Sequence, residues 1–158
     1  LNDPENLVVV DSETDTANGF TVLAGSRGVD TFTIGASTYA IVAATDDGGV
    51  QIIDVSDPTN IVAKDTLIDT NSLALASTND VDVFTIGAST YAIVTAVGYD
   101  DGVQIIDVSD PTNIVALDTL YDSDVGTLVL DGPVGVDTFT IGASTYAIVV
   151  AMHEPCLL

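Results

Sequence analysis

The stretch at residues 32–42, FTIGASTYAIV, occurs three times in the chain without a single change. Its second copy occupies residues 84–94 and its third copy residues 139–149. A second phrase, GVQIIDVSDPTNIVA, covers residues 49–63 and returns at residues 102–116. Equivalent positions lie 52 to 55 residues apart. Long and nearly identical repeats at such a period predict a tandem array of one structural unit.

Each repeat has the pattern of β-strands, because Val, Ile and Thr dominate, helical spacing of apolar residues is absent and turn signals recur every several residues. In the first complete copy, the expected strands are residues 29–34, 38–44, 50–55 and 61–68. The segments between them read GAS, DDGG and SDPTN. Asp-Gly sequences and proline at a corner are typical of tight turns.

The second of these strands is apolar on both sides. Tyr39, Ile41 and Ala43 face one way, and the alternate residues Ala40 and Val42 face the other. A strand buried on both sides belongs to a sheet that lies between two others. Four antiparallel strands of this kind, repeated every 50 or so residues, describe the blade of a β-propeller. We therefore expect an all-β fold, a β-propeller-type repeat of four-stranded antiparallel blades, with two full blades plus partial ones.

The repeats divide the chain as a single repeat domain over residues 1–158. The expected parts are an outer strand and connection of a partial blade at residues 3–28, blades at residues 29–80 and 81–135, and a partial blade at residues 136–158. The start, DPENLVVVD, resembles the end of the second phrase, whereas the tail MHEPCLL departs from the repeat where a third strand should begin. Propeller rings have at least about four blades. Either several chains complete a ring, or the sequence is part of a longer array, or the strands stack in an open arrangement.

The phrase GVQIIDVSDPTNIVA resembles the LVIVD repeat, whose pattern is a glycine, a β-strand that ends in an Asp, and a Ser-Asp-Pro turn. TYAIVA, which precedes it, is similar to the strand before this motif in that family. The resemblance implies a β-propeller in secreted or cell-surface proteins, commonly of bacteria and archaea, without a shared catalytic site. The Asp-rich connection at residues 11–25 is an addition to the pattern.

The charge balance limits the partners of the chain. Only Arg27 and Lys64 oppose 24 acidic residues, which leaves a formal net charge of −22. Nucleic acid and anionic membrane surfaces are poor partners, because binding them needs Lys and Arg. No apolar run approaches the length of a membrane span, so we expect no membrane insertion. Marine or saline surroundings, or bound cations, suit so acidic a chain, since salt screens its self-repulsion.

The catalytic inventory is small. His153 is the only histidine and Cys156 the only cysteine, and both lie in the divergent tail. The spacings of a nucleophile elbow and of a phosphate-binding loop are missing. We therefore expect no catalytic and no cofactor-binding residues, and a protein that is not an enzyme. Its many Asp residues leave open a different class, a hydrolase that uses clustered carboxylates.

Calcium is the better chemical candidate. Asp46, Asp47, Asp100 and Asp101 stand beside glycines at one end of each blade, and carboxylate oxygens suit calcium. None of these stretches fits the EF-hand pattern. The alternative is that they are solvated turns, because Asp-Gly is ordinary hairpin chemistry.

Aromatic residues offer a second kind of contact. Phe32 and Tyr39 recur in every repeat, where they either stack on sugars or pack between blades. Tyr99 and Tyr121 have no counterpart in every blade and lie near turns, so they are the candidates for exposed ligand contacts.

The expected function is a non-enzymatic, extracellular or cell-surface repeat module that serves as a binding or structural scaffold, with calcium stabilisation as an open possibility. Its expected partners are a protein or a glycan, and the chain is expected to be a homo-oligomer or a fragment of a longer repeat array. A carbohydrate-binding, lectin-like propeller is the main alternative.

Overall fold

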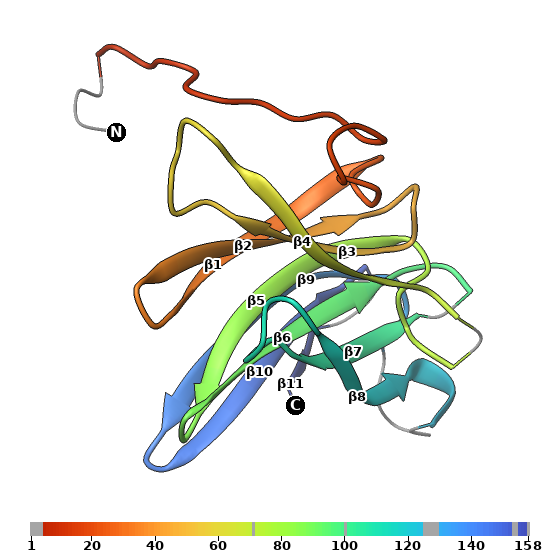
Figure 1. Ribbon diagram of the computed structural model, residues 1–158. Helices are drawn as coiled ribbons and strands as arrows, with labels where there is room; N and C mark the ends of the chain where they lie inside the picture. Colours follow the sequence, from red (N-terminus) through yellow and green to blue (C-terminus); the bar gives the residue numbers. More distant parts are fainter. Residues whose placement is uncertain (1–4, 71, 100, 125–129, 153–154, 158) are drawn as a thin grey trace.

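The computed structural model describes residues 5–70, 72–99, 101–124, 130–152 and 155–157, and these form three antiparallel sheets (Figure 1). The first sheet consists of β1 (Ser26–Ile34), β2 (Ser37–Ala44), β3 (Gly49–Asp54) and β4 (Val62–Ile68). The second consists of β5 (Thr78–Ile86), β6 (Ser89–Ala96), β7 (Gly102–Asp107) and β8 (Val115–Tyr121). The third has β9 (Pro133–Ile141), β10 (Ser144–Ala151) and β11 (Pro155–Leu157). A 3-10 turn, η1 (Asp122–Asp124), follows β8.

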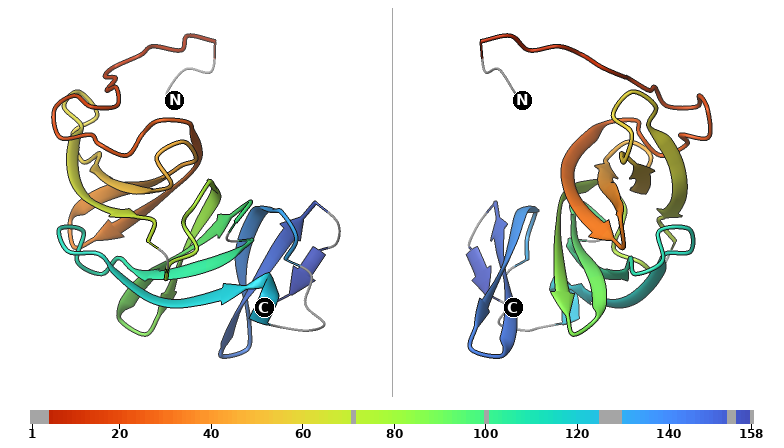
Figure 2. Two further views of the ribbon diagram at one scale, coloured as in Figure 1. Left: turned by 90° about the vertical axis from the view of Figure 1, so that its right-hand side faces the viewer. Right: turned by 60° about the vertical axis from the view of Figure 1, so that its left-hand side comes forward.

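The all-β prediction and the division into two four-stranded blades and a smaller one are confirmed. Within each sheet the strands follow chain order, and every neighbouring pair is antiparallel. The three sheets lie side by side like the segments of a fan, and β5 is adjacent to both β1 and β9 (Figure 2). The described part of the chain does not close into a ring.

Two sequence predictions at the ends of the array differ from the structure. Residues 6–11, expected as an outer strand, belong to none of the strands, because an outer strand needs the third strand of its own sheet and no such strand lies beside them among the described residues. The tail does contribute a third strand, since β11 pairs with β10 with Cys156 opposite Val149. Three residues of backbone pairing are enough to continue the third sheet in spite of the divergent sequence.

The repeated phrase forms the inner hairpin of each sheet. In the first hairpin, Phe32 lies opposite Tyr39 and their ring centroids are 5.6 Å apart. The corresponding distances in the other two hairpins are 5.6 Å and 5.8 Å. Gly35 in the connecting turn has φ of 63°, a conformation that favours glycine. One phrase therefore specifies one hairpin, turn included, three times.

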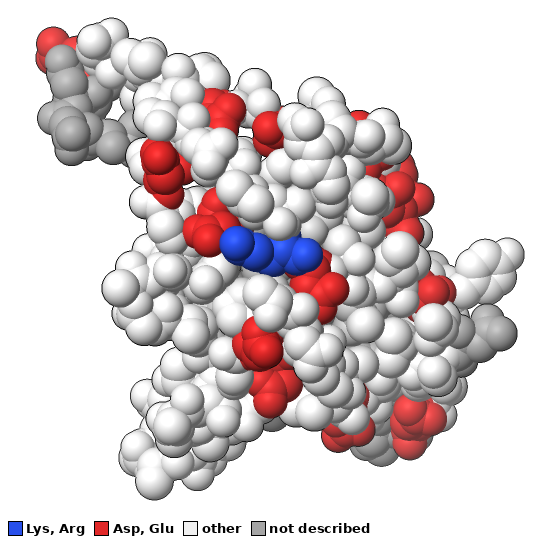
Figure 3. All heavy atoms as spheres, viewed as in Figure 1, with Lys and Arg blue, Asp and Glu red and all other residues white. Residues whose placement is uncertain are grey.

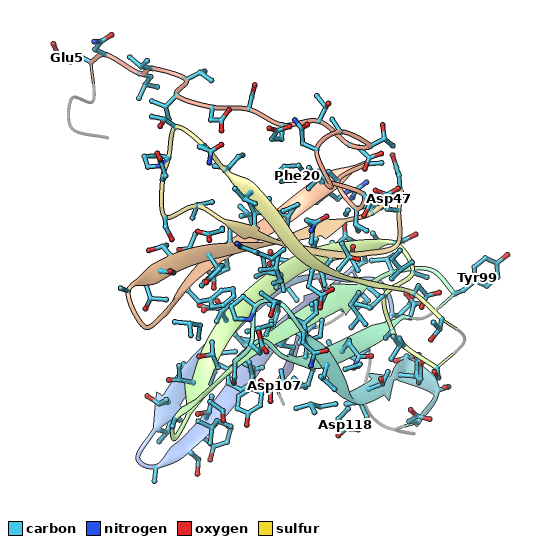
Figure 4. All side chains as sticks on the ribbon, in the orientation of Figure 1. Glu5, Phe20, Asp47, Tyr99, Asp107 and Asp118 are labelled. Carbon is cyan, nitrogen blue, oxygen red and sulfur yellow. The ribbon has the colours of Figure 1, made fainter. Side chains whose placement is uncertain are left out.

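Each sheet presents two apolar faces. We call the side that meets the next sheet along the chain the forward face, and the opposite side the rear face. The forward face of the first sheet, with Phe32 and Ile41, packs in one cluster with Val81 and Val94 from the rear face of the second. The second sheet packs on the third in the same way, and Phe20 covers the rear face of the first (Figure 4). The apolar core thus lies between sheets, as strands buried on both sides require.

Aspartate side chains also join the sheets. On the inner strands, Asp30 accepts a hydrogen bond from the amide of Val83 at 2.8 Å, and Asp82 accepts one from the amide of Thr138 at 2.9 Å. These bonds run from each sheet to the next at equivalent positions of the repeat. They satisfy amides on the free edge of an inner strand, which has no further strand to pair with.

A second series of such bonds joins the outer strands. Asp65 accepts the amide of Ile114 at 2.8 Å, and Asp11 accepts that of Ile61 at 2.9 Å. Asp11 therefore has the same contact as Asp65, although residues 6–11 form no strand. The segment before the first sheet is held to it by the contact that joins one sheet to the next.

A β-bulge positions Asp65. The register of β3 and β4 shifts between Gln51 and Ile53, and Gln51 is fully buried at this point. Its side-chain amide donates to the carbonyl of Asp65 at 3.1 Å, and its oxygen accepts the amide of Thr21. Bulges leave a backbone group unpaired and redirect a side chain. Here the glutamine satisfies the bulged carbonyl, while the aspartate turns toward the next sheet.

Acidic side chains dominate the charged surface. On the face shown in Figure 3, acidic atoms lie at several separate places and basic atoms form one small patch. Lys64 pairs with Asp54 at 3.2 Å, and Arg27 donates to the side chain of Asn79 on the second sheet at 2.8 Å. Both cations are therefore engaged in contacts within the molecule.

Candidate functional site

An open hollow beside the second sheet contains both tyrosines that the sequence singles out as ligand contacts. The hollow has a volume of about 210 Å³ and is lined by Tyr99, Asp101, Tyr121, Asp122 and Ser123. The ring of Tyr99 is fully exposed and projects away from the sheets (Figure 4). Aromatic rings beside hydroxyl and carboxylate groups can stack on, and hydrogen-bond to, a polar ligand such as a sugar.

Backbone hydrogen bonds hold the acidic side of this hollow. The carboxylate of Asp101 accepts the amides of Gly98 and Gly132 at 3.0 and 3.1 Å. The amide of Asp122 donates to the carbonyl of Asp101 at 2.8 Å. The carboxylate of Asp122 accepts the amide of Leu130 at 2.6 Å. The loop between β6 and β7 and the connection between β8 and β9 are fixed together in this way. No sequence pattern singles out Ser123, which enters the hollow because η1 turns the chain after β8.

The predicted calcium ligands that the structure describes lie in two separate turns. Asp100 lies outside the described residues, and Asp46 and Asp47 belong to a different turn from Asp101. The carboxylate of Asp47 accepts the amide of Ala24 at 2.7 Å, so it closes a loop as Asp101 does. Among the described residues, no group of three or more His, Cys, Asp or Glu side chains could hold a metal ion. The carboxylates that are described therefore do not fit a site with several converging oxygens.

Three of the aspartates that the structure describes make contacts between sheets. Asp30, Asp65 and Asp82 each accept an amide of the following sheet. Burial is the main cause that raises the pKa of Asp82, and the neighbouring carboxylates of Asp30 and Asp137 raise it further, against the lowering effect of its Thr138 hydrogen bonds. His153 lies outside the described residues, and only the backbone of Cys156 is described.

Three of the repeated aromatic residues lie at junctions between sheets, whereas Phe139 of the third hairpin is exposed. Phe32 is buried in the cluster between the first and second sheets, and Tyr39 packs against the same cluster. Phe84 packs against the cluster between the second and third sheets. Of the two interpretations that the sequence left open, packing between blades describes these residues.

Sequence reasoning missed the role of Gln51 and Gln104. Both are fully buried, and Gln104 accepts from Ala74 and Thr119 and donates to the carbonyls of Ile105 and Asp118. A polar residue in an otherwise apolar strand was the available signal, because buried polar groups need partners.

Two segments of the chain match a known family of repeats. Residues 37–68 and residues 91–120 match the LVIVD repeat. The chain contains two LVIVD repeats. The matched segments run from β2 to β4 and from β6 to β8, so each LVIVD repeat contributes three strands of a four-stranded sheet. The inner strand that completes each sheet precedes the matched LVIVD segment.

Solved structures with a similar fold are β-propeller-like enzymes. A GH32 β-fructofuranosidase of Bombyx mori, as a D63A mutant in complex with sucrose, aligns with a TM-score of 0.57 at 13% identity over 86% of this chain and 31% of the enzyme. Another structure of the same enzyme gives a TM-score of 0.52 at 13% identity, over 78% of this chain and 29% of the enzyme. The chain thus spans about a third of the enzyme's length, and the likeness concerns the fold alone. A search of curated proteins gives no match.

Among the described residues, the structure contains no helix that is long and apolar enough to span a membrane.

Proposed function

We propose that this LVIVD-repeat chain is a non-enzymatic module that acts outside the cell or at its surface as a binding or structural scaffold. The observation that carries the proposal is the use of its aspartates: Asp30, Asp65 and Asp82 join one sheet to the next through backbone amides. Side chains with such contacts build a stack of sheets. The stack then presents loops such as the one that carries Tyr99.

A glycan is the second candidate partner, and the hollow favours it. Tyr99 and Tyr121 supply aromatic faces, while Asp101, Asp122 and Ser123 supply hydrogen-bonding oxygens. Glycan recognition commonly combines stacking with such polar groups. A volume of about 210 Å³ is below the range typical of closed ligand pockets, which suits an open surface site for one or two sugar rings.

A glycan array with the wild-type chain and Tyr99→Ala separates the two forms of the proposal. Because Tyr99 is fully exposed, its replacement leaves the fold unchanged. A lectin binds a defined set of glycans and loses at least tenfold in affinity in the variant, whereas a protein-binding scaffold gives no glycan signal. A replacement at the exposed Ile68, outside the hollow, is the matched control.

Turnover assays address the hydrolase alternative. A panel of glycosides, with sucrose among them because a structural neighbour binds it, and of phosphate esters is expected to show no turnover. Turnover that is lost in Asp82→Asn would reject the non-enzymatic proposal. Calcium stabilisation stays a prediction of the sequence, and the melting experiment in the Discussion tests it.

A further inference from the structure

The forward face of the third sheet is exposed, although the same residues are buried in the first sheet. Phe32 is 6% exposed and its counterpart Phe139 is 37% exposed. Ile41 is fully buried and its counterpart Ile148 is 41% exposed. The difference arises because the second sheet covers the face of the first. The third sheet therefore presents an apolar surface that this fold elsewhere buries against another sheet.

The two faces are chemically the same. Residues 28–42 and 135–149 both read GVDTFTIGASTYAIV. In the first sheet this stretch packs against the rear face of the second sheet in the main cluster. The surface on the third sheet is thus a second copy of a surface whose fitting partner is already seen in the molecule, namely the rear face of a sheet of this same repeat.

The glycines at the start of this stretch give an independent indication. A Cβ atom on Gly28 would lie 2.7 Å from the Cα atom of Asp80 and 2.9 Å from the carbonyl of Asn79, so only glycine permits the approach of the second sheet. A Cβ atom on Gly135 would meet nothing closer than 3.7 Å, and its φ is not in the left-handed region. Nothing within the described chain requires glycine at residue 135. A neighbouring sheet that approaches as β5 approaches β1 would require it.

Phe20 packs against Ala40 and Ile53 on the rear face of the first sheet, and the part of this face on β1 is the complementary surface. Val29 is 63% exposed, whereas its counterpart Val81, covered by the preceding sheet, is 4% exposed. The amide of Thr31 donates to the side chain of the residue before it, Asp30, at 2.7 Å. Its counterparts Val83 and Thr138 instead donate to an aspartate of the preceding sheet.

The series of hydrogen bonds from inner aspartates to the next sheet therefore has an amide donor at its first-sheet end and a carboxylate acceptor at its third-sheet end. Asp30 and Asp82 each accept an amide of the following sheet, and Asp137 occupies the same repeat position in the third sheet. The amide at the corresponding position of the first sheet belongs to Thr31. Asp137 of one copy and Thr31 of another are the pair that would continue the series.

The segment before the first sheet points to a second copy as the occupant. Its residues 7–10 are apolar and exposed, and they read LVVV before Asp11, where the second sheet has IVAL before Asp118. Asp11 makes the contact that places an outer strand against the sheet that follows. Residues 7–10 thus occupy the place of the outer strand of a preceding sheet. A third sheet that docks on the rear face of the first would have its β11 edge beside them.

We propose that the forward face of the third sheet binds the rear face of the first sheet in a second copy of this chain. The contact joins different surfaces of two identical chains, so it repeats until the assembly closes. Propellers have about four to eight blades, and each chain supplies three sheets. Two copies, with two such contacts, close a ring of six blades.

Light scattering on a sizing column, with the full chain over a range of concentrations in sodium chloride, measures the assembly. We expect the wild type to have twice the mass of 16.2 kDa. We expect more of the two-chain species at higher salt, because two chains of net charge −22 repel each other and salt screens that repulsion.

Two variants leave the single chain intact and affect only the proposed contact. The methyl group of Gly135→Ala makes only ordinary van der Waals contacts within the chain, and Ile148→Asn alters an exposed side chain. Each is expected to weaken association at least tenfold, with an unchanged circular dichroism spectrum. Val115→Asn is the matched control. The second and third sheets cover the forward faces of the first and second sheets, and yet Val62 and its counterpart Val115 remain exposed. This control is expected to associate as the wild type does.

Three results would overturn the proposal. A wild-type chain with the mass of one copy at every concentration and salt level shows that the faces do not bind each other. A two-chain species that Gly135→Ala and Ile148→Asn leave intact shows that another surface joins the copies. A stable mass of three or more chains rejects the ring of six blades.

Discussion

The carboxyl group of Asp82 accepts hydrogen bonds from the third sheet, but its surroundings disfavour its ionised form. It accepts from both the amide and the hydroxyl of Thr138. Burial raises its pKa, as do the nearby carboxylates of Asp30 and Asp137. A carboxyl whose pKa is higher in the folded than in the unfolded state lowers stability above that folded pKa. This unfavourable contribution disappears as the pH falls through the folded pKa to the unfolded value near 3.8.

Asp82→Asn is therefore expected to raise the melting temperature at pH 7 and to make no difference below pH 3.8. Asparagine keeps an acceptor for Thr138 and removes the charge. Thermal unfolding of both chains between about pH 3 and pH 7 measures the effect. Asp82→Ala is the control: without an acceptor it is expected to lose roughly 1–3 kcal/mol below pH 3.8 and less at pH 7, where the wild type has the unfavourable charge. An Asn variant that is equally destabilised at all pH values would contradict the argument.

Replacement of Gln104 tests the buried polar link behind the β-bulge. Gln104→Leu keeps much of the volume but leaves the carbonyl of Asp118 and the amide of Ala74 without their partner. We expect a loss of about 2–4 kcal/mol in the free energy of unfolding, since each unsatisfied buried group is worth roughly 1–3 kcal/mol. Urea denaturation provides the measurement. A loss below about 0.5 kcal/mol would show that the glutamine is not needed for the bulge.

At the scale of elements, close approach of sheets decides which residues are tolerated. The inner strands β1 and β5 approach so closely that a Cβ atom placed on Gly28 would have backbone atoms of Asn79 and Asp80 within 3.0 Å. This approach brings Asp30 within reach of the amide of Val83. Glycine here serves packing between sheets rather than a turn.

Gly28→Ala is expected to destabilise the chain by about 2–4 kcal/mol, because the added methyl group forces two backbones apart. Gly135→Ala, at the same repeat position but with no atom closer than 3.7 Å to the added Cβ atom, is expected to change the stability of the single chain by less than about 0.5 kcal/mol. Chemical denaturation at a concentration where copies do not associate compares the two. Equal losses in both variants would mean that backbone preference, and not packing, explains them.

The strands could be predicted from sequence because alternation and turn chemistry are local properties. The expected strand at residues 38–44 matches β2 to within one residue. The contacts between sheets could not be predicted, since they depend on which side chain a bulge redirects. Asp65 reads in the sequence as one more acidic residue, and only the register shift in β4 shows that it reaches Ile114. The sequence predicted Tyr99 and Tyr121 of the hollow as exposed contacts. It did not predict that the loops which contain them lie side by side.

At the scale of the whole molecule, charge opposes the compact fold. A net charge of −22 on 158 residues produces self-repulsion that salt screens over roughly 8 Å at physiological ionic strength. The two basic side chains relieve little of it, because Lys64 is half-buried and pairs with a single carboxylate. Stability should therefore depend strongly on ionic strength.

The melting temperature is expected to rise by several degrees between about 10 mM and 0.5 M sodium chloride. Millimolar calcium at constant ionic strength is expected to add nothing, because Asp47 and Asp101 direct their carboxylates to backbone amides. Differential scanning calorimetry in both salts makes the comparison. A calcium shift beyond the sodium control would support the calcium ligands expected from the sequence, and its loss in Asp101→Asn would locate the site.

The identity of the three inner hairpins has a consequence for folding as well as for architecture. A chain that contains one hairpin three times cannot distinguish, from local contacts alone, which copy belongs beside which. During refolding the third hairpin competes with the first for the rear face of the second sheet, which yields compact states with sheets in the wrong order. The unrepeated parts, such as Phe20 over the first sheet and the contact of Asp122 with Leu130, supply the information that selects the native order. Those unrepeated connections therefore determine which of the three identical hairpins takes which position in the array.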